Sequence, residues 1–193
     1  MLEELIRLDQ ELFVDIHNAR NGFLDFLMPV ITNRWVWIPL YLFFAWWLSR
    51  KYRAKTIVIL LAAGLMIFIS DQGANLFKNN VKRPRPCHNT ELLKEHTVIT
   101  PNGCGGPFGF FSGHATNSFA LAMFMFLLVL RTKIENWKPW LLLFFWGIMV
   151  CWSRIYLGVH YPGDVLCGAL FGMLVGGLTY LALVKFYFRR HDA

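Results

Sequence analysis

Charged residues are scarce in this sequence, and they are largely kept out of its apolar stretches. They make up 16% of the 193 residues, against about 25% in a typical soluble domain. Hydrophobic residues account for 56% and aromatic residues for 17%, a composition that excludes a disordered chain, a collagen-like repeat and a coiled coil. We therefore expect a small membrane protein that crosses the bilayer several times. The length predicts one domain, residues 1–193.

Five apolar stretches are candidates for transmembrane helices, two of them marginal in length. A straight helix needs about 20 apolar residues to cross the hydrocarbon core, and long flanking side chains that reach back to the interface shorten this requirement. Of all acidic and basic residues, only Asp71 lies within one of these stretches. The fold class predicted is an all-α bundle of about five transmembrane helices. Their ranges are 35–49, 56–77, 112–130, 139–153 and 165–184.

The N-terminal segment, residues 1–33, has a different pattern. Its apolar residues recur near helical spacing with charged residues between them, as in Leu5, Ile6, Arg7 and Asp9. This pattern predicts a helix that lies in the membrane interface. A basic start, an apolar central region and a cleavage site are all missing, so we do not expect a cleaved signal peptide.

Residues 78–111 form the single long polar connection, rich in Pro, Gly and His. Ten Lys and Arg residues, Arg190 among them, flank the spans on one side of the membrane, and nine flank them on the other. Five of the nine cluster at 78–85 and at Arg154, where a phosphate site would need them. Discounting these five places the ten-residue face in the cytoplasm and the 78–111 loop outside. The expected location is a bacterial inner membrane with the site facing the periplasm.

Only four cysteines are present. Cys151 and Cys167 fall within or beside spans, where apolar packing is expected. Cys87 and Cys104 both lie in the external loop, and disulfides persist in oxidising compartments. We expect the two to be bridged, which would stabilise the loop by about 3 kcal/mol in the chain-entropy model. Two free thiols are the alternative.

The first stretch that could carry chemistry reads KNNVKRPRP. It places Lys78 and Arg85 at the membrane surface with Lys82 and Arg83 between them. So many cations in nine residues favour an anionic ligand. Anchoring to lipid headgroups is the alternative for this stretch alone.

The second stretch reads FFSGHATNSF at the start of the third span. Ser112 is a natural N-cap, and a helix N-terminus offers free N–H groups and a positive dipole end to a phosphate. His114 would lie beside that anion. Taken alone, the short pattern is more often an ordinary capped helix start than a catalytic site.

The third stretch reads SRIYLGVHYPGD. Pro162 is suited to begin the last helix, which puts Asp164 in its first turn. Asp164 could accept a hydrogen bond from one ring nitrogen of His160 and leave the other nitrogen as a lone-pair donor, as in a base or nucleophile held by a carboxylate. A structural histidine is the alternative for this stretch alone. However, all three stretches, the third of which also contains Arg154, are expected on the same face of the membrane.

Together the residues form three ordered motifs. They are Lys78, six residues, Arg85-Pro86; Ser112-Gly113-His114; and Ser153-Arg154, five residues, His160, three residues, Asp164. The sequence resembles the type 2 phosphatidic acid phosphatase family, which shares its site with vanadium haloperoxidases and glucose-6-phosphatase. The resemblance covers about half of the chain. Two features depart from it: Phe111 stands where the family usually has Pro, and five spans are expected where many members have six.

The resemblance implies a metal-free phosphoryl transfer in two steps, without a cofactor. His160 would attack phosphorus, Asp164 would orient His160, and His114 would protonate the leaving oxygen. The phosphate would be held by Lys78, Arg85, Ser112, the Gly113 N–H and Arg154. Positioning and charge neutralisation dominate such reactions, and fixed cations can supply both. The external loop offers only Glu91 and Glu95 as further carboxylates, too few for a two-metal centre.

A lipid phosphate is the expected substrate, because the motifs lie where spans meet the membrane surface; we expect no nucleic acid partner. Candidates are undecaprenyl diphosphate, phosphatidic acid, phosphatidylglycerol phosphate and a glycolipid such as lipid A. The small extramembrane mass argues against the glycolipid, and Lys82 and Arg83 could neutralise a diphosphate, so the isoprenoid diphosphate is favoured. The rivals to hydrolysis are phosphotransfer to a lipid or alcohol acceptor and non-catalytic anion binding. Asp71 either steers Lys78 or an arginine, or makes a buried hydrogen bond between helices.

Overall fold

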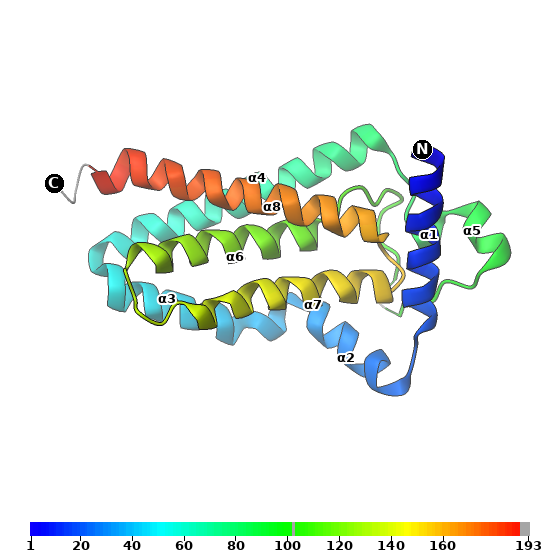
Figure 1. The fold of residues 1–193 in the computed structure, drawn as a ribbon, viewed down its shortest axis with the longest axis horizontal. Coiled ribbons are helices and arrows are strands. Elements are labelled where there is room, and N and C mark those ends of the chain that lie inside the picture. The colour runs from blue at the N-terminus through cyan, green and yellow to red at the C-terminus, as the bar shows by residue number, and fades with distance from the viewer. Residues whose placement is uncertain (102, 190–193) are drawn as a thin grey trace.

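Helices that run along one long axis make up most of the structure, and α1 lies across one end of them (Figure 1). The computed structural model describes residues 1–101 and 103–189; Arg190, one of the ten cations counted above, lies outside them. The described residues contain helices and turns but no strand. The α-helices are α1 (Leu2–Asn18), α2 (Gly22–Thr32), α3 (Ile38–Tyr52), α4 (Thr56–Val81), α5 (Thr90–Glu95), α6 (Gly113–Arg131), α7 (Leu142–Tyr156) and α8 (Pro162–Leu183).

The predicted all-α membrane bundle is confirmed. Four continuous helical stretches of the described chain are long and apolar enough to cross a membrane. The first of them, Arg34–Val81, contains both α3 and α4, which fold back on one another at Arg53 (Figure 1). Five helices therefore run along the bundle, as expected. Helix α4 continues to Val81, so that Lys78 lies in its last turn and not in the loop.

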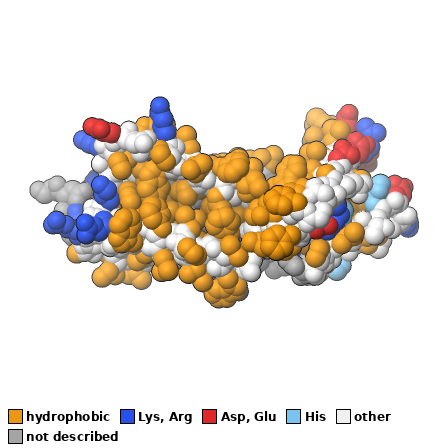
Figure 2. Space-filling view, turned by 90° about the horizontal axis from the view of Figure 1, so that it is seen from below, with side chains coloured by type: hydrophobic (Ala, Val, Ile, Leu, Met, Phe, Trp, Pro, Cys, Tyr) orange, Lys and Arg blue, Asp and Glu red, His pale blue; other side chains and the backbone are white. Residues whose placement is uncertain are grey.

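Apolar side chains cover the middle of the bundle, as Figure 2 shows. Exposed large hydrophobic residues occur on each of the five helices that run along the bundle, which are α3, α4, α6, α7 and α8. Basic side chains gather at the end that carries the C-terminus, while acidic and histidine side chains are prominent at the other end (Figure 2). An outward-facing apolar band between two polar ends is what a bilayer requires.

The N-terminal segment contains two helices, where a single interfacial helix was predicted for residues 1–33. Helix α1 ends at Asn18, and Asn21 caps α2 by accepting a hydrogen bond from the Leu24 N–H. Phe13 and His17 bury one face of α1, and Leu12 is exposed on another. Ala19, Arg20 and Asn21 separate the two helices, and α2 packs on α7.

A buried imidazole attaches α1 to the bundle. The Nδ1 of His17 lies 2.9 Å from the carbonyl oxygen of Tyr156 at the end of α7, and its Nε2 accepts a hydrogen bond from the Ile99 N–H at 3.0 Å. His17 therefore connects α1, the last turn of α7 and the loop between α4 and α6. Burial is the main cause that lowers the pKa of His17, which favours the neutral ring that this pair of bonds needs.

Helices α6 and α8 pack with their backbones close together. Gly168, Gly172 and Gly176 recur every four residues along α8. A Cβ atom at Gly172 would meet the backbone of Thr116, and one at Gly176 would meet that of Ala120. Small residues at this spacing allow close approach of membrane helices. The contact aligns the first turns of α6 and α8, which carry two of the three motifs.

Gly172→Ala is expected to destabilise the protein, because the added methyl group must displace backbone atoms of α6. Overpacking typically costs about 1–3 kcal/mol, partly offset by the helix propensity of Ala, about 1 kcal/mol. Gly177→Ala is the matched control, since a Cβ atom there meets nothing within 4 Å. Thermal unfolding of the detergent-solubilised protein should show a lower midpoint for the first variant only. Equal midpoints for the two variants would contradict close packing of α6 on α8.

Candidate active site

The three motifs meet at the end of the bundle next to α1. One cavity of about 740 Å³ is lined by six of the eight predicted site residues. The other two, Ser112 and Asp164, are fully buried. The six lining residues are Lys78, Arg85, Gly113, His114, Arg154 and His160.

Backbone hydrogen bonds hold the three motifs together. The Ser112 N–H donates to the Asp164 carbonyl oxygen at 3.0 Å, which joins the beginnings of α6 and α8. The Arg85 N–H donates to the Pro107 carbonyl, and the Gly109 N–H donates to the Arg83 carbonyl. The segment that precedes α6 is thereby paired with the first motif.

Gly109 is a site residue that the sequence did not reveal. A Cβ atom there would lie 3.1 Å from Asp164 Oδ2 and 3.2 Å from Arg85 Cγ. Glycine at this position thus allows the loop backbone to lie in close contact with the side chains of Asp164 and Arg85.

His160 and Asp164 lie next to one another, but the hydrogen bond that their spacing predicted is not formed. His160 Nδ1 lies 3.6 Å from Asp164 Oδ2, which is too long for a hydrogen bond, and Nδ1 is buried without a hydrogen-bond partner in the described part of the chain. Catalytic hydrogen bonds of this kind often tighten only when the substrate is bound. The arrangement orients Nδ1 toward the carboxylate; the role of Nε2 as the lone-pair donor stays a prediction.

The surroundings of His160 keep its ring neutral. The side chain is 2% exposed, and burial, assisted by the positive charge of Arg154, lowers its pKa to about 4, against the opposing effect of Asp164. A neutral imidazole has the free lone pair that a nucleophile requires.

Two further groups are well placed to hold an anion. Arg154 is fixed by a hydrogen bond from Nη1 to Thr32 Oγ1 at 2.8 Å, and its Nε has no hydrogen-bond partner among the described residues. Ser112 occupies the N-cap position of α6, as predicted, but its hydroxyl makes no capping bond. That hydroxyl is also buried without a partner in the described chain, so it can bind a phosphate oxygen at the N-terminus of α6. Thr32, at the end of α2, gave no signal in the sequence.

The sequence-based role of Arg83 is wrong. It was expected, with Lys82, to neutralise the second charge of a diphosphate. Arg83 instead donates from Nη1 to Asp164 Oδ1 at 2.8 Å and from Nη2 to Asp9 Oδ2 at 2.6 Å. Lys82 ends α4 in the left-handed conformation and is exposed. Neither residue lines the cavity, so neither supplies charge there.

Asp71 combines features of the two interpretations. It accepts a hydrogen bond of 3.4 Å from Asn117 on α6, so the predicted contact between helices exists. The pair is not buried, however, since Asp71 is exposed and both residues line the cavity. A Cβ atom at Gly113 would lie 3.6 Å from Asp71 Oδ1 and 3.7 Å from Lys78 Nζ, which places the carboxylate beside the predicted phosphate site.

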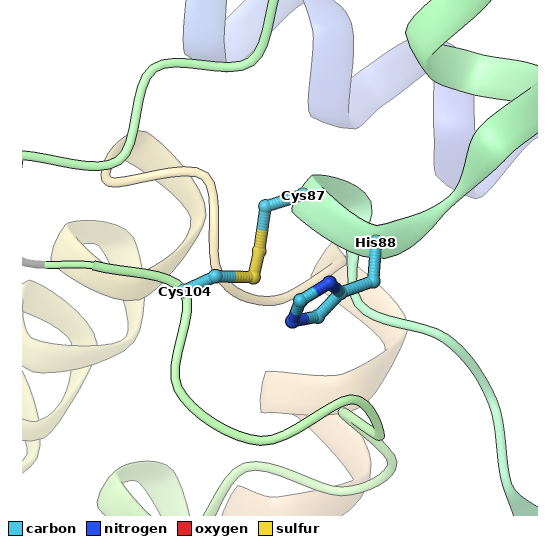
Figure 3. Close-up of side chains that lie close together, drawn as sticks. All are labelled: Cys87, His88 and Cys104. Carbon is cyan, nitrogen blue, oxygen red and sulfur yellow. A yellow bond between two sulfur atoms is a disulfide. The ribbon is translucent and has the colours of Figure 1, made fainter.

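Cys87 and Cys104 form the predicted disulfide, with their Cα atoms 6.1 Å apart. Figure 3 shows His88 beside the bridge, and the ligand atoms of the three residues lie within 4.8 Å of one another. Three such groups could hold a metal only with free thiolates. With the sulfur atoms bonded to each other, this cluster offers one imidazole, and the bridge restrains the loop between α4 and α6.

Comparison with known proteins identifies the family. Residues 55–188, more than half of the chain, match the profile of the PAP2 superfamily. The chain belongs to the PAP2 superfamily. The matched residues include all eight predicted site positions, so the three motifs of this chain lie within the match.

Relatives of this PAP2 chain include named phosphatases. The lipid A 4'-phosphatase of Bacteroides thetaiotaomicron is 33% identical over 96% of this chain and 81% of its own length. That of Porphyromonas gingivalis is 29% identical over 93% and 74%. The undecaprenyl-diphosphatase BcrC of Bacillus subtilis is 27% identical over 90% and 83%.

Solved structures have the same fold. The phosphatidylglycerolphosphate phosphatase of Bacillus subtilis superimposes with a TM-score of 0.72 at 20% identity, over 95% of this chain and 88% of that one. Aquifex aeolicus LpxE superimposes with a TM-score of 0.63 at 26% identity, over 88% and 92%. The protein is thus an integral membrane enzyme, a PAP2 lipid phosphatase.

Proposed function

We propose that this phosphatase removes a phosphate monoester from the headgroup of a lipid A-type glycolipid, at the periplasmic face of a bacterial inner membrane. The observation that carries the proposal is the composition of the cavity: the three motif cations line it together with Arg34 and with the polar side chains of Asp71, Asn117 and Tyr41. The near full-length similarity to two lipid A 4'-phosphatases supports it. The basic end of the bundle opposite the site supports the orientation.

Both histidines line the cavity, and the proposed reaction gives each of them one role. The Nε2 lone pair of His160 attacks phosphorus, and a P–N bond forms while the ester P–O bond breaks. His114 donates its proton to the leaving sugar oxygen. Water then attacks the phosphohistidine, His114 takes a proton from it, and inorganic phosphate leaves. Lys78, Arg85 and Arg154 neutralise the charge on the phosphoryl oxygens throughout.

The cavity favours a sugar beside a single phosphate. Asp71, Asn117 and Tyr41 line it together with the three motif cations and Arg34, and these three polar side chains can hydrogen-bond sugar hydroxyls. A second phosphate next to the first would meet the negative charge of Asp71, while Arg83 is neutralised by two carboxylates. The diphosphate preference predicted from the sequence depended on Lys82 and Arg83, neither of which lines the cavity, and is therefore not retained. The small extramembrane mass is no obstacle, because these polar groups come from the helices themselves.

A panel of purified lipids tests the proposal. The protein, in vesicles, is given lipid A, phosphatidic acid and undecaprenyl diphosphate, and both phosphate release and product mass are measured. Lipid A should be hydrolysed fastest. Asp71→Asn should lower its hydrolysis about tenfold relative to phosphatidic acid, since a hydrogen bond to a charged group contributes about 1.5–3 kcal/mol, and should spare the diphosphate.

Glu91→Gln is the matched control, because Glu91 is exposed and pairs with Lys94 outside the cavity. It should leave all three rates unchanged. Preference of the unmodified protein for undecaprenyl diphosphate, or an equal loss on all three lipids in Asp71→Asn, would reject the glycolipid assignment.

A further inference from the structure

We propose that Asp9, in the crosswise helix α1, is a positioning residue that holds the Asp164 carboxylate for catalysis by way of Arg83. The inference rests on the proposed roles of His160 and Asp164. It extends the site to a helix that lies outside the matched part of the chain, which begins at residue 55.

The geometry links three side chains in series. Arg83 uses different nitrogens for the two carboxylates, Nη1 for Asp164 at 2.8 Å and Nη2 for Asp9 at 2.6 Å. Its guanidinium also lies over the Tyr161 ring, 4.2 Å from the centroid. An arginine whose two terminal nitrogens are hydrogen-bonded and whose guanidinium plane packs on an aromatic ring has little freedom to move.

Asp9 is itself fixed at the start of α8. Its Oδ1 accepts a hydrogen bond of 2.7 Å from the Gly163 N–H, one of the free donors in the first turn of the helix. A Cβ atom at Gly163 would lie 2.9 Å from Asp9 Oδ2, so glycine is what permits this approach. The Asp9 side chain is only 16% exposed and that of Arg83 only 21%, which shields the pair from solvent screening.

The series determines both the direction and the charge of Asp164. Its Oδ2 accepts from the Tyr161 N–H at 3.0 Å and faces His160, while its Oδ1 is held by Arg83. One guanidinium shared by two carboxylates leaves one net negative charge on the group. That charge is what stabilises His160 when its ring becomes positive during phosphoryl transfer. Without Asp9, Arg83 would neutralise Asp164 and be free to turn.

Two other roles for Asp9 make different predictions. Its role could be limited to attaching α1 to the bundle. In that case, loss of the Asp9 carboxylate would lower the stability of the protein and leave the rate of the chemical step unchanged. Alternatively, α1 could contact the lipid surface through exposed residues such as Leu5 and Leu12. Loss of Asp9 would then raise KM for lipid substrates and spare a small soluble phosphate.

The test compares Asp9→Asn with Asp15→Asn, which removes the same charge from an exposed position of the same helix. Steady-state rates are measured with a lipid phosphate and with nitrophenyl phosphate, together with inhibition by vanadate and by inorganic phosphate. For Asp9→Asn we expect kcat to fall about ten- to hundredfold on both substrates, as displaced reacting groups do, with KM and phosphate inhibition unchanged. Vanadate mimics the transferring phosphoryl group and should bind more weakly by a similar factor. Asp15→Asn should change none of these.

Arg83 supplies the second variant. Arg83→Lys keeps the cation but cannot bridge two carboxylates, and should reproduce the loss in kcat even if Asp9→Asn folds poorly. In an Arg83→Gln background, Asp9→Asn should have almost no further effect. An unchanged kcat in Asp9→Asn, a rise in lipid KM alone, or independent effects of the two positions would each overturn the inference. Turnover that survives in His160→Ala would instead overturn the proposed mechanism, whatever the result at Asp9.

Discussion

His160→Ala is expected to abolish turnover on every lipid phosphate, because no other group at the site can form the covalent intermediate. Asp164 is fully buried, and both its oxygens already accept hydrogen bonds, from Arg83 and from the Tyr161 N–H. His114 has the proposed role of proton donor to the leaving oxygen, so it is not the proposed nucleophile. The measurement is phosphate release from lipid A, with trapping of radiolabelled phosphohistidine in the denatured protein.

The control for this variant is His88→Ala, which removes an exposed histidine at the same end of the molecule. It should retain full activity and the labelled intermediate. Phosphate binding should survive in His160→Ala, since the three cations and the start of α6 remain. Residual turnover in His160→Ala with a labelled residue elsewhere would contradict the assignment of the nucleophile.

His114→Ala is expected to reduce turnover strongly without abolishing it. His114 lines the cavity at the first turn of α6 and is exposed to it. Loss of a general acid typically costs about 10²–10⁴-fold. The loss should be largest for alkyl and sugar phosphates, whose leaving oxygen must be protonated, and smallest for nitrophenyl phosphate.

The informative quantity for this variant is therefore the ratio of the two losses. Asn117→Ala, which changes a residue of the same helix that also lines the cavity, serves as the comparison. It should reduce hydrolysis of alkyl and nitrophenyl phosphates equally, because neither substrate has the sugar hydroxyls that Asn117 can bind. Equal damage by His114→Ala on alkyl and nitrophenyl phosphates would assign His114 to phosphate binding in place of proton transfer.

Much of the fold was predictable from the order of apolar and polar residues. A segment that crosses hydrocarbon must satisfy its backbone internally, so an uncharged apolar stretch has to become a helix. The five long helices follow the predicted spans for this reason. The details at their ends were not predictable. Helix α4 extends through Lys78 to Val81, and residues 1–33 contain two helices, because local capping and contacts with α7 determine where each helix ends.

The residues of the proposed site could also be named from the sequence. Each motif combines a helix end with a cation or an imidazole, and these are features that a linear pattern displays. The disulfide could be expected from two cysteines in one loop that the charge pattern predicts to be external. The pattern could not show which way each side chain points. Arg83 and Arg85 are two residues apart in the sequence, yet Arg85 lines the cavity and Arg83 binds Asp9 and Asp164.

The sequence by itself determined that this protein is a helical membrane bundle with a phosphate site at one end, because hydropathy and motif spacing are local properties of the chain. Only the tertiary structure decided which cations reach the cavity, that Asp71 borders it and that Asp9 supports Asp164. Asp9 and Arg83 are 74 residues apart, and Arg83 and Asp164 are 81 apart. Contacts at such separations depend on how whole helices pack, and that packing is set by close approaches such as Gly163 on Asp9 and Gly172 on Thr116.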